Sequence, residues 1–308
     1  MNRFHGFDYL RVVAMAAVIY VHGCDTNATA ESATKLLSFP VPCFLLMSAF
    51  LTQWSLFDKR PSYIHLMRKR ITRLAVPFLA WSVVYLLVRY AKSAATGQSV
   101  DSSLIGCLFW GDASHQLYFI PLLIYCLAFW SLPMRLAPKH TTTLALICVA
   151  AIVAALYFEK TLNDMFPANR YFIAKNLVWF PIGMLLAIAI RQMDQWRHHF
   201  FWPAGISVVL LLVTRQWNVY ALTISLFLLA CSVKTPPQKS WTYLSEISFG
   251  IYLAHVLFIE TFQFVIPKIG LSVASLAITI GVIVASSVAS VILCTLLDRS
   301  PRTRWSVR

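Results

Sequence analysis

The chain has 308 residues, of which 59% are hydrophobic and only 12% charged, and its mean hydropathy is +0.68. An ordinary soluble domain is about half apolar and about a quarter charged, so this composition excludes a soluble globular protein and indicates a membrane protein. The net charge of +14 would suggest nucleic acid binding in a soluble protein, but here the basic residues report membrane topology, and no nucleic acid partner is expected.

Ten apolar segments are predicted to be transmembrane helices, because a helix needs about 20 mostly apolar residues to cross the hydrocarbon core. They lie at 7–24, 36–57, 72–92, 116–134, 141–158, 174–191, 200–214, 217–233, 245–266 and 271–297. With the N-terminus inside, 17 of the 26 basic residues fall on the cytoplasmic side and eight on the other, while Arg11 lies within the first segment. This bias and the even number of segments predict that both termini are cytoplasmic. The expected fold is an all-α polytopic membrane protein with one membrane domain over residues 1–308.

Seven cysteines fall mostly within the apolar segments and show no CxxC spacing. They are Cys24, Cys43, Cys107, Cys126, Cys148, Cys231 and Cys294. We interpret them as small buried hydrophobic side chains rather than disulfides or metal ligands, and no metal site is predicted.

The first predicted helix carries ionisable residues, which are costly inside a membrane and therefore indicate function. Arg11 and His22 are eleven residues apart, so in a helix they differ by about 20° around the axis and by about 16 Å along it. Asp8 and Asp25 each lie three residues from one of these basic side chains. The structural alternative is an Asp8/Arg11 pair that snorkels to the cytoplasmic surface and a His22 that packs at the outer interface. Asp8 and Arg11 also argue against a cleaved signal peptide, because they interrupt its apolar run.

A basic cluster precedes the third predicted helix. It contains Lys69, Arg70 and Arg73, and the two arginines are neighbours on one helix face, where they can grip a phosphate. The alternative is that these charges only set topology or attract anionic lipid.

Two later segments add candidate site residues. His115 and Tyr118 lie at the outer entrance to the fourth helix, where an aromatic belt explains the tyrosine but not the histidine. His255 lies about ten residues into the ninth helix, near the bilayer midplane, with Tyr252 three residues earlier on its face. The alternative for His255 is a neutral, hydrogen-bonded structural histidine.

Taken in this order, these elements resemble the acyltransferase-3 family of integral membrane acyltransferases. The residues that carry the resemblance are 7–14 with His22, 39–51, 70–73 with Pro77, 115–119 and 248–255. Two positions depart from the family pattern, since Ala49 stands where Gly is usual and Tyr118 where Trp is usual. The resemblance covers nearly the whole chain, and the family also has ten spans.

The resemblance implies transfer of an acyl group, usually acetyl, from cytoplasmic acyl-CoA to a hydroxyl group. The acceptor would be a glycan or lipid-linked saccharide at the outer face of the inner (cytoplasmic) membrane, with no cofactor besides the acyl-CoA co-substrate. Catalytic roles fall on His22 as base or covalent acyl carrier, Arg11 as CoA ligand or charge stabiliser, and Asp25 as orienting group. The predicted acyl-CoA ligands are Lys69, Arg70, Arg73 and Arg11, and the predicted acceptor or acyl pocket contains His115, Tyr118, Tyr252 and His255.

A transporter or flippase and a non-catalytic scaffold are the two alternatives to the acyltransferase. A transporter or flippase of an anionic solute or lipid would line its pathway with Arg11, His22 and His255, but the paired repeats common in transporters are not evident in the sequence. A non-catalytic scaffold would not need the alignment of Arg11 with His22.

Overall fold

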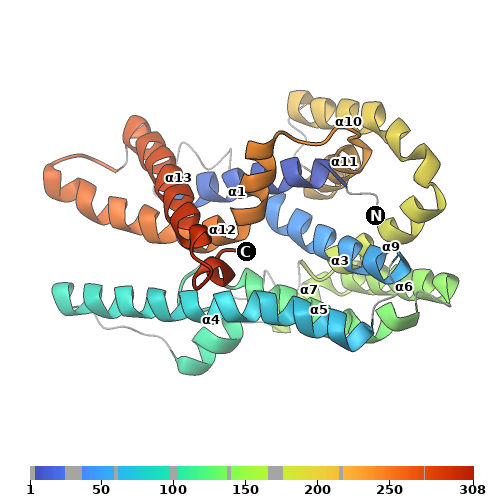
Figure 1. The fold of residues 1–308 in the computed structure, drawn as a ribbon, viewed down its shortest axis with the longest axis horizontal. Helices are drawn as coiled ribbons and strands as arrows, with labels where there is room; N and C mark the ends of the chain where they lie inside the picture. The colour runs from blue at the N-terminus through green and yellow to red at the C-terminus, as the bar shows by residue number, and fades with distance from the viewer. Residues whose placement is uncertain are drawn as a thin grey trace. The chain divides into compact units, whose positions relative to one another are not determined.

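The structure, a computed structural model, describes residues 4–24, 37–58, 62–97, 103–136, 140–165, 176–214, 218–273 and 275–308. Within these residues all regular structure is helical, which confirms the all-α prediction (Figure 1). The chain divides into two compact units, each assembled from three segments. The first unit is Met1–Phe7, Val41–Ile71 and Leu122–Pro236, and the second is Asp8–Pro40, Thr72–Pro121 and Pro237–Arg308.

The helices of the first unit are mostly short and apolar. They are α3 (Pro40–Asp58), the start of α4 (Tyr63–Thr96), most of α5 (Phe119–Leu136), α6 (Thr141–Tyr157), α7 (Glu159–Met165), α9 (Trp179–Gln192), η4 (Asp194–Phe200), α10 (Phe201–Thr214) and α11 (Val219–Ser232). The second unit contains nearly all of α1 (Gly6–Gly23), the rest of α4, η2 (Gly106–Trp110), α12 (Lys239–Val265), η5 (Ile266–Ile269), α13 (Leu276–Arg299) and η6 (Arg304–Ser306).

A helix overlaps each of the ten predicted segments. By length and composition, four helices of the described chain can cross a membrane: α3, α4, α12 with η5, and α13. The apolar helices α5, α6, α9, α10 and α11 are shorter. These helices fit a membrane protein, whereas the number of ten spans and the cytoplasmic placement of both termini stay predictions. The single domain over residues 1–308 likewise stays a prediction.

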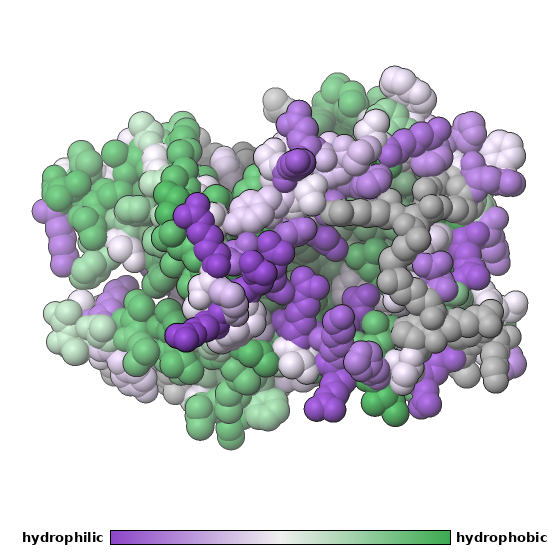
Figure 2. Space-filling view, in the orientation of Figure 1, coloured by the Kyte–Doolittle hydropathy of each residue, from purple (hydrophilic) through white to green (hydrophobic). Residues whose placement is uncertain are grey.

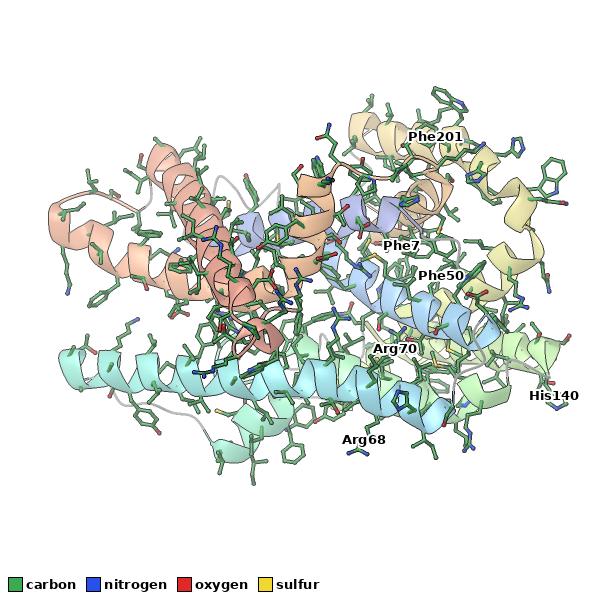
Figure 3. All side chains as sticks on the ribbon, in the orientation of Figure 1. Phe7, Phe50, Arg68, Arg70, His140 and Phe201 are labelled. Atoms are coloured by element: carbon green, nitrogen blue, oxygen red, sulfur yellow. The ribbon has the colours of Figure 1, made fainter. Side chains whose placement is uncertain are left out.

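Helix α4 is longer than the third predicted segment, which was expected to begin at residue 72. It begins at Tyr63, so Lys69 and Arg70 lie inside the helix rather than in a loop. Its 34 residues extend about 51 Å, whereas the hydrocarbon core is about 30 Å thick. Charge marks where a helix leaves the hydrocarbon and not where the helix ends, so the predicted span of 72–92 can lie within the longer helix. Figure 3 shows Arg68 and Arg70 projecting from different sides of α4.

Helix α13 carries different kinds of side chain on its exposed face and on its buried face. Every fourth residue of one stripe is a large aliphatic side chain that is 50–57% exposed: Leu276, Ile280, Val284, Val288, Ile292 and Leu296. The buried face instead carries small side chains, among them Thr279, Ser286, Ser290 and Cys294. Small residues let membrane helices approach closely, and large apolar ones face the lipid tails. Figure 2 shows the hydrophobic surface over α13.

An aromatic cluster forms the core of the first unit. The ring of Phe4 contacts those of Phe50 and Trp54 at 5.0 Å between centroids, and the ring of Phe7 contacts that of Phe227 at 5.1 Å. Figure 3 labels Phe7 and Phe50 in this cluster. Packing of these rings stabilises Phe4 and the start of α1 against α3 and α11.

All seven cysteines lie among the described residues, where none forms a disulfide and all are buried. The interpretation of these residues as small hydrophobic side chains is therefore confirmed.

Candidate active site

Two histidines that are 93 residues apart in sequence meet in the second unit. His22 lies in the last turn of α1, and His115 lies in the turn that follows η2. The Nδ1 atom of His22 is 3.0 Å from the Nε2 atom of His115, and the ring centroids are 4.5 Å apart. His115 is exposed and His22 is half-buried. In the tautomer in which Nδ1 of His22 donates to His115, the Nε2 atom of His22 carries the lone pair of the neutral imidazole.

His255 adds a third imidazole to this group. Its ring centroid is 5.3 Å from that of His22, and its side chain is fully buried in α12. The Nδ1 atom donates to the main-chain oxygen of Tyr252 at 2.6 Å. Since a carbonyl oxygen can only accept, Nδ1 carries the proton and Nε2 is an acceptor, and Nε2 has no hydrogen-bond partner among the described residues. The three histidines therefore lead from the exposed side chain of His115 to a buried acceptor atom of His255.

The turn that carries His115 depends on Gly111. Its φ of 76° is a left-handed conformation that favours glycine, and a Cβ atom there would lie 2.6 Å from the main-chain nitrogen of Tyr118. In this turn Ser114 donates to the Oε1 atom of Gln116 at 2.5 Å, and both side chains are buried. The main-chain oxygen of Gln116 accepts from the hydroxyl of Tyr252. The turn is thus tied to α12 one helical turn from His255.

Tyr85 of α4 fixes the local geometry of α12. Its hydroxyl donates to the main-chain oxygen of Leu253 at 2.7 Å and accepts from the main-chain nitrogen of Leu257 at 3.1 Å. These two groups would bond each other in a regular α-helix, so the hydroxyl is inserted into the helical ladder. Such insertions bend helices, and Figure 1 shows α12 changing direction along its length. The interrupted main-chain hydrogen bond, between Leu253 and Leu257, spans the turn that contains His255.

Asp8 and Arg11 occupy the opposite end of α1. The carboxylate of Asp8 is buried, accepts from the hydroxyl of Ser245 at 2.8 Å and lies 3.7 Å from a terminal nitrogen of Arg11. The predicted pair between Asp8 and Arg11 therefore exists. Because eleven residues of helix, about 16 Å, separate Arg11 from His22, these two side chains serve different ends of one helix.

The structure gives the remaining predicted site residues no contact with the three histidines that can be described. Lys69 and Arg70 belong to the first unit, whereas Arg73 belongs to the second and donates from Nε to the main-chain oxygen of Arg308 at 2.7 Å. Tyr118 is half-buried in the turn after His115. Asp25 lies outside the described residues. The roles predicted for all these side chains stay predictions.

Sequence reasoning missed Gln116, Tyr85 and Arg308. Gln116 was adjacent to a motif but gave no separate signal, and Tyr85 is one aromatic residue within an apolar run. Only the fold shows that Tyr85 and Gln116 contact α12, because those two contacts join positions more than 130 residues apart, and that Arg308 pairs with Glu246.

The helical architecture, the lipid-facing stripe and the group of histidines define a membrane protein with an enzyme-like site. Comparison with protein families shows that the chain belongs to the acyltransferase-3 family, whose model, described as an acyltransferase domain, matches residues 4–299. Neither the curated proteins nor the solved structures that were compared gave a match. The family assignment is confirmed, and it supports a membrane acyltransferase over a transporter.

Proposed function

We propose that this protein transfers an acyl group, expected to be acetyl, from cytoplasmic acyl-CoA to a hydroxyl group. The acceptor would be a glycan or lipid-linked saccharide at the outer face of the inner membrane. The observation that carries the proposal is the 3.0 Å contact between His22 and His115 beside the buried His255, in a chain of an acyltransferase family. Acyl transfer needs a group that binds and releases a proton near neutral pH, and imidazole is the side chain suited to that task.

In a direct transfer, His22 removes the proton from the acceptor hydroxyl while the oxygen of that hydroxyl attacks the thioester carbonyl. A C–O bond forms, the C–S bond breaks, and His22 then delivers the proton to the departing CoA sulfur. In this mechanism Nδ1 of His22 donates to Nε2 of His115, which lies 3.0 Å away, so that Nε2 of His22 is unprotonated before the reaction. In this role His115 orients the base, which is the function that the sequence suggested for Asp25.

In a covalent route, Nε2 of His22 attacks the thioester first. The acyl group moves to the imidazole, the C–S bond breaks, and the proton on Nδ1 passes through His115 to the CoA sulfur. The acceptor hydroxyl then takes the acyl group, and its proton restores the neutral imidazole. Both routes convert acyl-CoA and an alcohol into an ester and CoA, and both need the same two histidines.

The donor would bind from the cytoplasmic side through its phosphates. Arg73 has an exposed guanidinium, and Arg70 and Lys69 precede it on the same continuous helix. Guanidinium groups bind phosphate oxygens in pairs, which supports these side chains as ligands of CoA. Arg11 would stabilise the polyanionic donor from α1.

The test is the rate of CoA release from acetyl-CoA by the protein in nanodiscs, with membrane glycolipid extracts as acceptors. We expect acceptor-dependent release by the wild type and a loss of about 10²- to 10⁴-fold in His22→Ala, as is typical when a catalytic acid–base group is removed. His140→Ala is the matched control, because it removes an exposed histidine at the start of α6 (Figure 3) and should leave the rate unchanged. Full activity of His22→Ala would refute the role of His22.

A further inference from the structure

The residues that follow α13 fold back onto the second unit. Residues 300–308, here called the C-terminal strap, lie beyond the part of the chain that the family model matches. Val307 is fully buried, and its main-chain oxygen accepts from the main-chain nitrogen of Gly250 at 3.2 Å. The main-chain oxygen of Ser306 accepts from Nε1 of Trp81 at 3.2 Å. The strap therefore contacts both α12 and α4.

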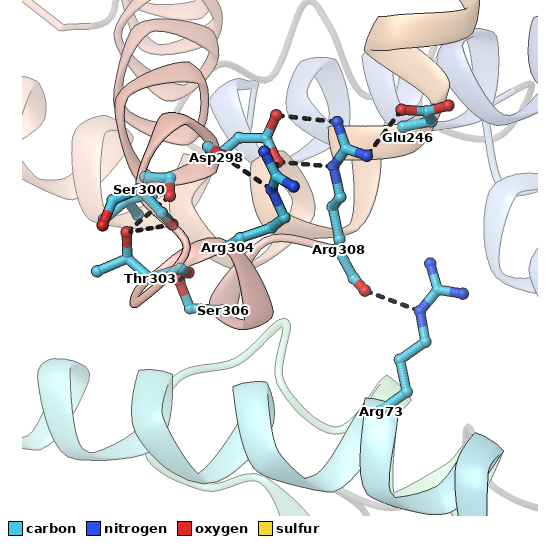
Figure 4. A network of polar contacts seen from close by, with 9 residues as sticks. Arg73, Glu246, Asp298, Ser300, Thr303, Arg304, Ser306 and Arg308 are labelled. Atoms are coloured by element: carbon cyan, nitrogen blue, oxygen red, sulfur yellow. Dashed lines mark hydrogen bonds and ion pairs between the residues drawn. The ribbon is translucent and has the colours of Figure 1, made fainter.

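Ion pairs anchor the end of the strap (Figure 4). The guanidinium of Arg308 meets the buried carboxylate of Asp298 through two nitrogens, Nε at 2.6 Å and Nη2 at 2.9 Å. Its third nitrogen, Nη1, lies 3.0 Å from the carboxylate of Glu246. The hydrogen bond to Asp298 and the two nearby carboxylates raise the pKa of Arg308. All three guanidinium nitrogens of Arg308 are thus used inside the protein, and this side chain is not available to a ligand.

Arg73 is held by the strap in a different way. Its Nε atom donates to the main-chain oxygen of Arg308 at 2.7 Å, and this is its one hydrogen bond within the described chain. The two terminal nitrogens of Arg73 are directed away from Arg308 (Figure 4). Guanidinium is planar and rigid, so fixing one of its nitrogens fixes the direction of the other two. The result is an exposed, oriented pair of donors that matches two oxygens of a phosphate.

We propose that the C-terminal strap positions Arg73 to bind a phosphate group of the acyl-CoA donor, with Arg308 as the positioning residue. This inference rests on the proposed function, since it assigns the ligand of Arg73 as CoA. Orienting a long side chain before the ligand arrives reduces the conformational entropy lost on binding. The strap would therefore raise donor affinity without taking part in the transfer of the acyl group.

The test compares Arg308→Ala with the matched control Arg302→Ala in the full chain in nanodiscs. Both variants remove one positive charge from the strap, but the side chain of Arg302 is exposed and makes no polar contact within the described residues. We expect Arg308→Ala to raise the KM for acetyl-CoA about 3- to 10-fold, as expected for the loss of one preorganised contact, with kcat unchanged. Arg302→Ala should stay within about twofold of the wild type.

A second donor separates positioning from a general loss of structure. S-acetylpantetheine carries the thioester but no phosphate, so its KM should not change in Arg308→Ala. An equal rise of KM for both donors would mean that the strap only stabilises the fold, and a lower KM for acetyl-CoA would mean that the strap competes with the donor. Either result would overturn the inference. Val307→Asp, which places a charge in a buried position, should reproduce the effect of Arg308→Ala by displacing the strap.

Arg73→Ala distinguishes this inference from the function it rests on. Arg73→Ala is expected to weaken CoA binding. If the double variant with Arg308→Ala binds CoA no more weakly than Arg73→Ala alone, the two residues act through one contact. If Arg73→Ala weakens binding and Arg308→Ala alone does not, the strap has no positioning role but the donor site stands. If Arg73→Ala leaves CoA binding unchanged, the proposed role of Arg73 in donor binding is wrong.

Discussion

His115 occupies the place that a carboxylate holds in many catalytic triads. It contacts Nδ1 of His22, the nitrogen remote from the one we propose to react, and it is exposed while His22 is half-buried. An exposed imidazole can exchange its proton with water, which a buried carboxylate cannot do. In the proposed function, His115 would both orient His22 and exchange the proton with solvent.

Replacing His115 tests this role at the scale of one side chain. Loss of a hydrogen bond to a group that becomes charged costs about 1.5–3 kcal/mol, so we expect kcat of His115→Ala to fall about 10- to 100-fold. The KM for acetyl-CoA should not change, because His115 lies outside the proposed phosphate site. His115→Gln, whose amide can still meet Nδ1 of His22, should recover part of the rate. Initial rates at saturating donor provide the measurement, and a wild-type rate in His115→Ala would show that the contact is dispensable.

The sequence predicted the individual histidines but not their contact. His22 and His255 were predicted as site residues because ionisable side chains are rare in apolar helices. His115 was predicted because an aromatic belt does not explain a histidine. Nothing in the spacing of His22 and His115 shows that they touch, since their contact is created by the packing of α1 and the turn after η2. The tautomer of His255 likewise follows from a main-chain oxygen that only the structure locates.

At the scale of helices, the apolar segments were predicted well and their ends less well. Helix α12 starts at Lys239 rather than at 245, and α4 starts nine residues before its predicted boundary. Both differences occur where polar residues continue a helix outside the apolar stretch. Hydropathy detects the hydrocarbon, whereas the helix is held by its own main-chain hydrogen bonds and continues in the headgroup region.

Ala49 of α3, which stands where the family usually has glycine, faces a glycine of α9. Gly183 of α9 faces it, and a Cβ atom added to Gly183 would lie 2.9 Å from the Cβ atom of Ala49 and 2.5 Å from the main-chain oxygen of Leu46. Helices α3 and α9 can approach this closely because one of the two facing residues is glycine.

This close approach predicts the effect of a single methyl group. Gly183→Ala should destabilise the protein by about 1–3 kcal/mol, because main-chain atoms of α3 cannot move aside as a flexible side chain would. Gly205→Ala is the control within the same unit, since no atom lies within 4 Å of the added Cβ, and it should be neutral or stabilising by up to about 1 kcal/mol. Thermal unfolding in detergent measures both. Equal melting temperatures for the two variants would show that α3 and α9 are not closely packed at this position.

At the scale of the whole molecule, the second unit has two separate groups of polar residues. The histidines lie at the end of α1. The Asp8/Arg11 pair lies at the start of α1, and the ion pairs of the strap lie at the start of α12. Asp8 bonds to Ser245 near the start of α12, and Arg308 pairs with Glu246 in the same turn. The predicted orientation places the start of α12 in the cytoplasm. It follows that acyl-CoA would bind at the end with the arginines and the acceptor at the end with His115.

The most direct test of this account is the sidedness of the reaction in sealed vesicles. Acetyl-CoA does not cross a bilayer, so inside-out vesicles expose the proposed donor site to added acetyl-CoA and right-side-out vesicles hide it. We predict that labelled acetyl groups reach glycolipid acceptors only in inside-out vesicles, that they are found on the lumenal leaflet, and that His22→Ala abolishes the transfer. Equal transfer in both kinds of vesicle, or transfer only in right-side-out vesicles, would contradict a reaction that draws its donor from the cytoplasm.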